Sequence, residues 1–568
     1  MLWGRMSSNA VLAALLSCAW PEASFAEGGA AACKLIRNVA QLQAMKDDLA
    51  GSYCLARDID AGSMENFVPV GTSNARFTGK FFGNGYVISN LTIESAREYV
   101  GLFGIADGAL IRDVGLINAK VTSTKGNAVG VGGLLGSAQP ATAISRVHVT
   151  GSIRCRGCSW VGGIVGALAT DSVIAESWSS ARVAGPDSSR AGGAVGFSSG
   201  EITRTHATGA VTCGDNCKAG GLAGASGYPG IVDLSYATGP VTVGEGESAS
   251  AGGLLGRQEG HISATRRSYA AGPVTGGAGA YVGGLIGQMA SDLTQGYAVG
   301  HVDGESGRTG GLIGQILATP EITDSYWDTD TTGQMTSPAG TAQTTAQLRA
   351  DLPSGFDDPW AITKTRSYPF LNDVDFDLAS PLATLVRTSK VFVFVPIRQL
   401  DPWEYKNPPL HADAASKAAL FAIIARAIGV AKDIAALKKA KISRYWDDAS
   451  QTATWQGEVA LHATLGTLKP ITAGARLDST NVIGAMQKQK LVILRGTYTT
   501  ASGGSATHWM LGTLFTRDNS DKLGAVVAHD PWTGRQVMID PATKKVFSPA
   551  SFPLAKFRVN GYRQVTLN

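Results

Sequence analysis

Between residues 99 and 330, one pattern of apolar and small residues recurs along the chain. A β-branched or small residue is followed by Gly-Gly, then by two apolar residues and a third glycine. The first glycine of each copy stands at position 132, 162, 192, 220, 252, 283 or 310. Successive copies are therefore 27 to 32 residues apart, and a fixed period of this size is typical of a solenoid.

The second half of each period alternates Val, Ile and Thr with polar residues, as at 111–114, 144–147 and 202–205. Such segments predict short strands, and the Gly, Ser, Asn and Asp residues between them predict turns. No run in this region keeps a helical period. Several short strands in each period fit one coil of a β-helix. We expect the glycines to permit left-handed backbone at the corners and a close approach of neighbouring coils.

The pattern changes after residue 371, where the Gly-Gly motifs stop and helix-forming residues and lysines become common. Residues 372–385 are expected to form a linker. One helix is expected from Asp413, as its N-cap, to about residue 439. Strands are expected at 391–395, 491–494, 508–516, 523–529, 535–539 and 559–568. An early helix packed on a later antiparallel sheet predicts an α+β domain.

Composition narrows the class of protein. Glycine supplies 71 of 568 residues, but without the every-third-residue period of collagen. Charged residues make up only 17% of the chain and apolar residues 44%, which argues against a charge-driven disordered chain. The net charge is +4, with acids and bases interspersed, so no basic stripe favours nucleic acid as a partner.

The N-terminus reads as an export signal over residues 1–26. Arg5 precedes an apolar run at 10–19, which is too short to span a bilayer, and a small-x-small cleavage site follows at 24–26. The alternative is a lipoprotein signal, in which Cys18 carries the lipid anchor. No later segment has 18 uncharged apolar residues in a row, so we expect no transmembrane helix.

Six cysteines follow the signal. They fall into three sequence-local pairs: Cys33 and Cys54, Cys155 and Cys158, Cys213 and Cys217. An even number in an exported chain favours three disulfides. The alternative is a zinc site made by the last four thiolates. We predict the disulfides, and neither a metal nor a cofactor.

Several segments resemble GLUG-repeat proteins. FTGKFFGNGYVISNLTI at 77–93 and YVGLFG at 99–104 look like the opening segment of such arrays, and LARDID at 55–60 looks like their first strand. SYWDTDTTG at 325–333 and SYPFL at 367–371 look like their closing segment. The resemblance covers roughly residues 33 to 372. It implies a right-handed parallel β-helix, which we assign to residues 27–371.

GLUG arrays occur in exported bacterial surface proteins, including adhesin-like chains and immunoglobulin A peptidases, and no GLUG residue there is catalytic. The resemblance therefore implies a stalk or an adhesive surface. The partner would be a protein or polysaccharide at the cell surface or host interface.

Three polar residues of the second domain, 386–568, stand in the order of another family. Gln399 precedes the expected helix, His508 starts a strand, and Asp530 begins the sequence DPWTG at 530–534. This order resembles papain-like cysteine peptidases of the bacteriocin-processing, or double-glycine-peptidase-like, branch. The resemblance implies that the His is the general base, that the Asp orients it, and that the Gln helps to hold the oxyanion.

The chain departs from that family at the nucleophile. Ala415 stands where the family has its catalytic cysteine, and no cysteine follows Cys217. Thiolate attack is therefore impossible by the family route. We expect a non-catalytic, peptidase-like binding module. The alternative is an active papain-like hydrolase, either one in which His508 deprotonates Ser416 or one that uses chemistry the sequence does not reveal.

A third hypothesis is polysaccharide cleavage on the solenoid. It would need basic and acidic residues clustered on one face of the coils. We find no such cluster in the sequence and therefore do not expect this activity.

Overall fold

The computed structural model describes most of the repeat region and the strands of the C-terminal part. The described residues are 33–260, 263–357, 359–362, 368–371, 446–447, 452–453, 472–474, 490–499, 505–517, 523–530, 535–539 and 558–566. In this part of the chain, no helix has the length and apolar character needed to span a membrane.

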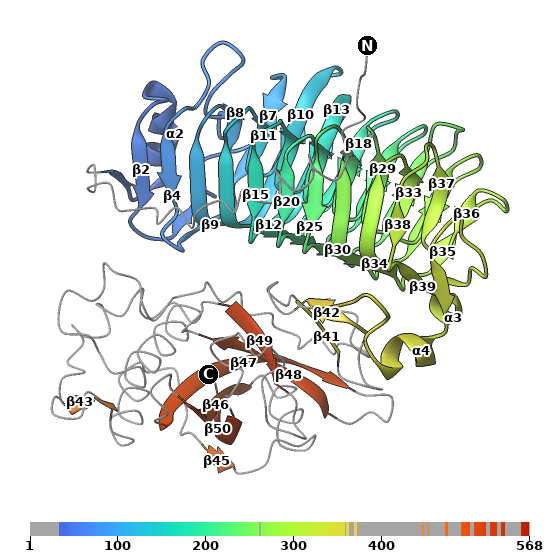
Figure 1. The fold of residues 1–568 in the computed structure, drawn as a ribbon. Helices are drawn as coiled ribbons and strands as arrows, with labels where there is room; N and C mark the ends of the chain where they lie inside the picture. Colours follow the sequence, from blue (N-terminus) through green and yellow to red (C-terminus); the bar gives the residue numbers. More distant parts are fainter. Residues whose placement is uncertain are drawn as a thin grey trace, which may run out of the picture.

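The repeat region is a parallel β-solenoid (Figure 1). Each residue of a coil pairs with the residue about one period later. Ile174 faces Ile202, for example, and Val195 faces Ala223. The parallel pairing and its offset confirm the β-helix predicted from the repeat. The alternation of apolar and polar residues places one set of side chains, such as Ile174 and Val195, in a continuous core between the sheets.

Two eight-stranded sheets flank the glycine motif. The approach sheet, whose strands lead into Gly-Gly, contains β7 (Tyr99–Val100), β10 (Ala128–Gly132), β13 (Cys158–Gly162), β18 (Arg190–Gly192), β23 (Lys218–Gly220), β28 (Ser250–Gly252), β32 (Tyr281–Gly283) and β36 (Thr309–Gly310). The exit sheet, whose strands follow the motif, contains β8 (Phe103–Ala106), β11 (Leu135–Ala138), β14 (Val165–Leu168), β19 (Val195–Ser198), β24 (Ala223–Ser226), β29 (Leu255–Gln258), β33 (Ile286–Met289) and β37 (Ile313–Ile316).

The remaining strands of the solenoid form one 24-stranded sheet, called here the large sheet. Its first strands are β1 (Lys34–Ile36), β2 (Ser52–Leu55), β3 (Ile59–Asp60), β4 (Lys80–Phe82), β5 (Val87–Ser89), β6 (Thr92–Ser95), β9 (Leu110–Ser123) and β12 (Ala143–Cys155). The middle coils add β15 (Val173–Ala175), β16 (Trp178–Ser179), β17 (Arg182–Gly185), β20 (Glu201–Thr203), β21 (His206–Ala207), β22 (Val211–Cys213), β25 (Ile231–Asp233), β26 (Tyr236–Ala237) and β27 (Val241–Val243). The last coils add β30 (Ala264–Ala270), β31 (Val274–Gly276), β34 (Asp292–Ala298), β35 (Val302–Asp303), β38 (Ile322–Thr323), β39 (Tyr326–Asp328) and β40 (Thr341–Gln343).

The glycine motif forms the corner between the approach and exit sheets. In one copy, β13 ends at Gly162 and β14 begins at Val165. A Cβ atom on Gly163 would lie closer than 3.0 Å to the carbonyl oxygen of Gly193 in the next coil. The backbone of the neighbouring coil thus fills the space that a side chain would need, which confirms the expected close approach.

Glycines such as Gly108 and Gly279 do take left-handed backbone at turns, as expected. At one corner within the large sheet, however, the left-handed residues are not glycine. One residue in each of eight coils has φ between 40° and 60°, and none of the eight is glycine. They are Asp113, Arg146, Glu176, Arg204, Leu234, Arg267, Gln295 and Asp324. The motif glycines themselves do not have positive φ.

Hydroxyl groups support this corner. The N–H of Val147, directly after Arg146, donates to the Ser177 hydroxyl of the next coil at 3.1 Å. The Ser177 hydroxyl in turn donates to the Ala175 carbonyl at 2.8 Å. The same arrangement links Thr205 to Ser235 at 3.2 Å. Because the stack supplies these bonds in successive coils, non-glycine residues can be held in a conformation that costs about 1–3 kcal/mol.

Short helices lie at both ends of the solenoid. The first coil carries α2 (Val39–Gln43) and the 3-10 helix η1 (Ala44–Asp47), and their Leu42 and Met45 are buried in the solenoid core. The other end carries α3 (Thr329–Thr332), α4 (Thr345–Ala350), β41 (Trp360–Ala361) and β42 (Phe370–Leu371) (Figure 1). We call the described residues between 329 and 371 the closing segment.

The closing segment covers a ladder of stacked tyrosines on the large sheet. The rings of Tyr236, Tyr269 and Tyr297 stack at 4.8 and 5.0 Å between centroids. Phe356 and Trp360 pack in the same buried cluster. The Tyr297 hydroxyl donates to the Pro369 carbonyl at 2.5 Å, and burial raises the pKa of that hydroxyl well above its ordinary value.

The six cysteines pair as predicted. Cys33 bonds to Cys54, Cys155 to Cys158, and Cys213 to Cys217. The Cα atoms of the pairs are 5.7, 6.0 and 6.0 Å apart, within the usual range for disulfides. This pairing leaves none of the six thiols for the zinc site considered as the alternative.

The described C-terminal strands include a six-stranded sheet of antiparallel pairs. In spatial order its strands are β45 (Thr472–Gly474), β50 (Arg558–Thr566), β46 (Lys490–Thr499), β47 (Ser505–Arg517), β48 (Leu523–Asp530) and β49 (Arg535–Ile539). A separate antiparallel pair joins β43 (Trp446–Asp447) and β44 (Thr452–Ala453).

The last five predicted strands, from 491–494 to 559–568, therefore coincide with observed ones. The predicted strand at 391–395, the helix at 413–439 and the linker at 372–385 lie outside the described residues, as does the export signal at 1–26.

Candidate binding site on the solenoid

Two of the peptidase-like residues lie on neighbouring antiparallel strands. His508 is in β47, and Asp530 is the last residue of β48. Leu511 pairs with His529, so His508 and Asp530 lie towards the same end of the strand pair. Gln399, Ala415 and Ser416 lie outside the described residues. The strand pairing brings these two positions near each other in the sheet, and their roles, like the rest of that site, stay a prediction.

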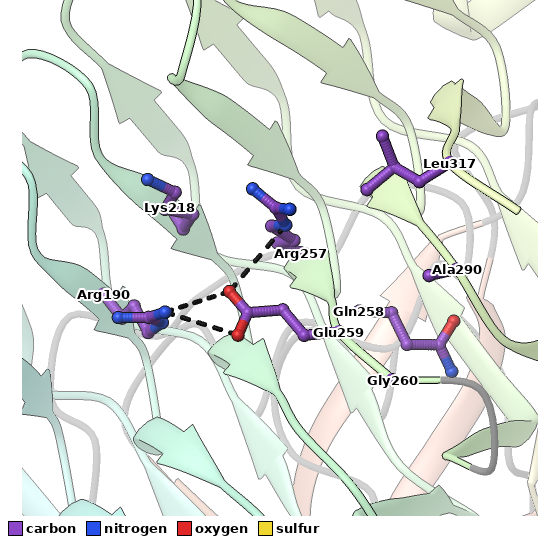
Figure 2. A pocket seen from close by; sticks show the side chains of 8 residues that line it. All are labelled: Arg190, Lys218, Arg257, Gln258, Glu259, Gly260, Ala290 and Leu317. Carbon is purple, nitrogen blue, oxygen red and sulfur yellow. Dashed lines mark hydrogen bonds and ion pairs between the residues drawn. The ribbon is translucent and has the colours of Figure 1, made fainter.

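A different group of polar side chains gathers on the solenoid. It lines a cavity of about 510 Å³ on the outer side of the approach and exit sheets (Figure 2). The lining residues are Arg190, Lys218, Arg257, Gln258, Glu259, Gly260, Ala290 and Leu317. We call this the basic pocket.

The repeat builds the basic pocket from residues that flank the glycine motif. Arg190 and Lys218 each stand one residue before the motif and pair across β18 and β23. Arg257 stands one residue after the motif, in β29. Because approach and exit strands meet at the motif corner, residues on its two sides project toward a shared surface. Alternation along each strand turns their neighbours, such as Ala191, into the core.

One carboxylate links two of the cations. Arg190 Nη2 donates to the two Glu259 carboxylate oxygens at 3.0 and 3.3 Å, and Arg257 Nε lies 3.7 Å from the nearer one (Figure 2). Lys218 donates instead to the Asn216 carbonyl at 3.1 Å. Three cationic side chains and one carboxylate leave the pocket with a surplus of two positive charges.

Burial and like charge lower the pKa of the Lys218 ammonium. Partial burial is the larger cause, the positive charges of Arg190 and Arg257 add to it, and Glu259 opposes it. A group in this setting is stabilised in its charged form by any anion that approaches it. The pocket is therefore electrostatically suited to a negatively charged ligand.

Aromatic side chains extend the same surface on both sides of the pocket. Trp160, in β13, stacks on Phe197 with ring centroids 5.6 Å apart and an interplanar angle of 19°. The Arg190 guanidinium lies 5.3 Å from the centre of the Phe197 ring. In the other direction, the Arg308 guanidinium lies 4.8 Å from the centre of the Tyr281 ring.

These residues follow one another in the stack of coils. The column before the motif runs Trp160, Arg190, Lys218, Ser250 and Tyr281 through successive register pairs. Four strand spacings of about 4.8 Å make this column about 19 Å long. We call it, with the residues beside it in the exit sheet, the binding column.

Amide side chains follow in the exit sheet, and two of them, Gln258 and Gln288, are buried. Gln288 follows Arg257 in register, and its amide donates to Gln315 of the next coil at 2.7 Å. Within the described part of the chain, the side-chain carbonyl oxygens of Gln258 and Gln288 are buried without a hydrogen-bond partner. Because these two oxygens are buried, they offer no acceptor to a ligand, and the exposed polar groups of the pocket are its cations and the Glu259 carboxylate.

The structure corrects our expectation that the solenoid carries no cluster of basic and acidic residues. Arg190, Lys218, Arg257 and Glu259 form one, although they are far apart in sequence. The signal was present in the repeat itself. When its copies are aligned on Gly-Gly, the positions just before and just after the motif hold the three cationic side chains.

Among known proteins, no family model matches the chain. The chain is similar to Halomucin of Haloquadratum walsbyi, with 33% identity over 252 residues. The match covers 41% of this chain and only 3% of the length of Halomucin. Among solved structures, a proposed immunoglobulin A1 protease from Bacteroides ovatus is similar at 21% identity and a TM-score of 0.35. That match covers 60% of this chain and 92% of the other.

Proposed function

We propose that this chain is an exported interaction protein that works at a cell surface, with the solenoid as its binding surface. The observation that carries the proposal is the binding column, where cationic and aromatic side chains occupy four of five successive coils and the buried Ser250 occupies the other. Three disulfides suit an oxidising compartment outside the cytoplasm. The GLUG-like segments and the similarity to Halomucin are consistent with this role.

The second part of the proposal concerns residues 386–568, which we propose act as a peptidase-like module that binds without cleaving. Ala415 supplies no nucleophile at the position where the family has cysteine. The placement of His508 and Asp530 towards one end of β47 and β48 supports the resemblance to that family.

Activity assays on the full chain test this second part. The wild-type chain and the variants Ala415→Cys and His508→Ala are incubated with a fluorogenic peptide library and a serine-reactive fluorophosphonate. We expect the wild type to be inert, because a nucleophile is missing. Ala415→Cys should gain cleavage, and Ala415→Cys combined with His508→Ala should lose it again, because the thiol needs its base.

One outcome would contradict the proposal of a non-catalytic module. If the wild type cleaves peptides or is labelled, and His508→Ala abolishes this, the chain is a hydrolase and Ser416 is the first candidate nucleophile.

The binding role of the solenoid is tested separately, by measuring whether the full chain adheres to intact cells and to their extracted surface polysaccharide and protein. Absence of adherence to all three would contradict it.

A further inference from the structure

We propose that the basic pocket and the binding column hold a linear polysaccharide that carries carboxylate or sulfate groups. This inference rests on the proposed function and names the ligand class of that surface. The ligand would lie along the stack of coils, with its acidic group at the pocket and neighbouring sugar rings against the aromatic side chains.

The charges of the basic pocket favour an anionic group. Arg190 and Arg257 share Glu259. Of the three cations in the pocket, Lys218 is therefore the one with no carboxylate of the described residues within 4.0 Å. Lys218 lies between Arg190 and Ser250 in the approach sheet, at the middle of the binding column. An acidic substituent placed here would meet one ammonium directly and two guanidinium groups nearby.

The side chains around the pocket favour a sugar chain over a phosphodiester. Sugar rings present apolar faces that stack on aromatic side chains, and Trp160 with Phe197 provides such a platform one or two coils from Lys218. Sugar hydroxyls both donate and accept, so a hydroxyl beside the pocket can donate to the carboxylate of Glu259. The phosphate groups of a phosphodiester backbone only accept, so they offer Glu259 no hydrogen-bond donor.

The arrangement also favours a linear ligand. The binding column crosses five coils in register, over about 19 Å at the strand spacing of a β-sheet. A small anion would use only the pocket and would gain nothing from Trp160 or Tyr281. A chain of sugars can contact the pocket and both aromatic positions at once, so that several modest contacts add to a useful affinity.

The experiment compares four probes on the full chain by calorimetry at low salt. The probes are polygalacturonate, which carries carboxylates, dextran sulfate, which carries sulfates, neutral dextran, and a DNA duplex. The variant Lys218→Gln removes one positive charge without orphaning a carboxylate. The matched control is Lys120→Gln, because Lys120 is an exposed lysine of β9 in the large sheet. A second variant, Trp160→Ala, removes the aromatic platform.

We expect one or both acidic polysaccharides to bind, with dextran at least tenfold weaker. Lys218→Gln should weaken that binding by about tenfold, as the loss of one charge-assisted contact would, and Lys120→Gln should leave it unchanged. Trp160→Ala should weaken polysaccharide binding and leave DNA binding as it was. The comparison of polygalacturonate with dextran sulfate identifies the acidic group.

Three results would overturn the inference. One is that neither acidic polysaccharide binds. Another is that DNA binds as tightly and is weakened equally by Lys218→Gln and Lys120→Gln, which would indicate general charge attraction. The third is that dextran binds as well as the acidic chains. In the last case, or if the chain adheres to cells through a protein, the ligand class is wrong while the proposed function stands.

Discussion

At the scale of single residues, Lys218 shows how a side chain of the proposed binding surface can oppose stability. Its pKa is lowered in the folded chain by burial and by two neighbouring guanidinium groups. The unfolded chain therefore holds this proton more tightly than the folded one. At pH values below the lowered pKa, the protonated lysine reduces the free energy of unfolding. Stability rises as the pH passes from the lowered pKa to the ordinary value.

This predicts that Lys218→Gln stabilises the protein near pH 7 while it weakens ligand binding. Glutamine has no charge to lose, so the gain should shrink as the pH approaches 10.5, the ordinary value for lysine. Thermal unfolding of both proteins between pH 6 and about pH 10 measures the difference. A lower midpoint for Lys218→Gln at pH 7 would contradict the prediction and would mean that the lysine stabilises the fold.

At the scale of elements, the motif glycines and the left-handed corner solve different problems. The glycines allow the backbones of neighbouring coils to touch, as at Gly163. The left-handed corner uses ordinary residues such as Arg146, because a hydroxyl from the next coil satisfies the adjacent N–H. Where neighbouring coils need space, the sequence shows a recurring glycine. Where stacking imposes a left-handed conformation, the residue type varies, and the sequence does not reveal that conformation.

The contrast predicts the effects of two alanine substitutions. Gly163→Ala should destabilise the solenoid by about 1–3 kcal/mol or more, because its Cβ would overlap the Gly193 carbonyl oxygen. Gly126→Ala is the control, since a Cβ there meets nothing within 4 Å. It should be neutral, or stabilising by about 0.4–1 kcal/mol through the unfolded state. Urea unfolding of the two variants compares them, and equal effects would argue against coil contact as the reason for the motif.

The same contrast explains what the sequence could predict. The parallel solenoid follows from the period and from the strand-like alternation, and the disulfides follow from cysteine spacing. The basic pocket does not follow from either rule, because Arg190, Lys218 and Arg257 look like isolated surface residues when the sequence is read linearly. Their proximity comes from the register between coils, which becomes visible when the copies are aligned on the motif.

At the scale of the whole molecule, the disulfides differ in how much chain they constrain. The bond between Cys33 and Cys54 joins residues 21 apart, whereas the other two join residues 3 and 4 apart. In the chain-entropy description, the longer loop contributes the most stability. It also ties β1 to the region of β2, at the first coil.

We therefore predict that replacing Cys33 and Cys54 together with serine lowers the free energy of unfolding by about 2–4 kcal/mol. The corresponding change at Cys155 and Cys158 should cost less. Urea unfolding measures the loss of unfolding free energy in each variant. Reductant should cause no additional loss through the disulfide that the variant already lacks. If the short-loop variant loses as much stability, loop length does not explain the contribution of these bonds.

The in-register stacking of the coils has a consequence for how such a chain can change over evolutionary time. A duplicated or deleted coil would meet matching neighbours on both sides, since the corners and register pairs repeat, and the closing segment would still cover the last tyrosines. Each event would lengthen or shorten the molecule by one strand spacing, about 4.8 Å. The reach of the protein can thus vary in discrete steps, while the order of side chains along the binding column keeps a record of which coils were copied.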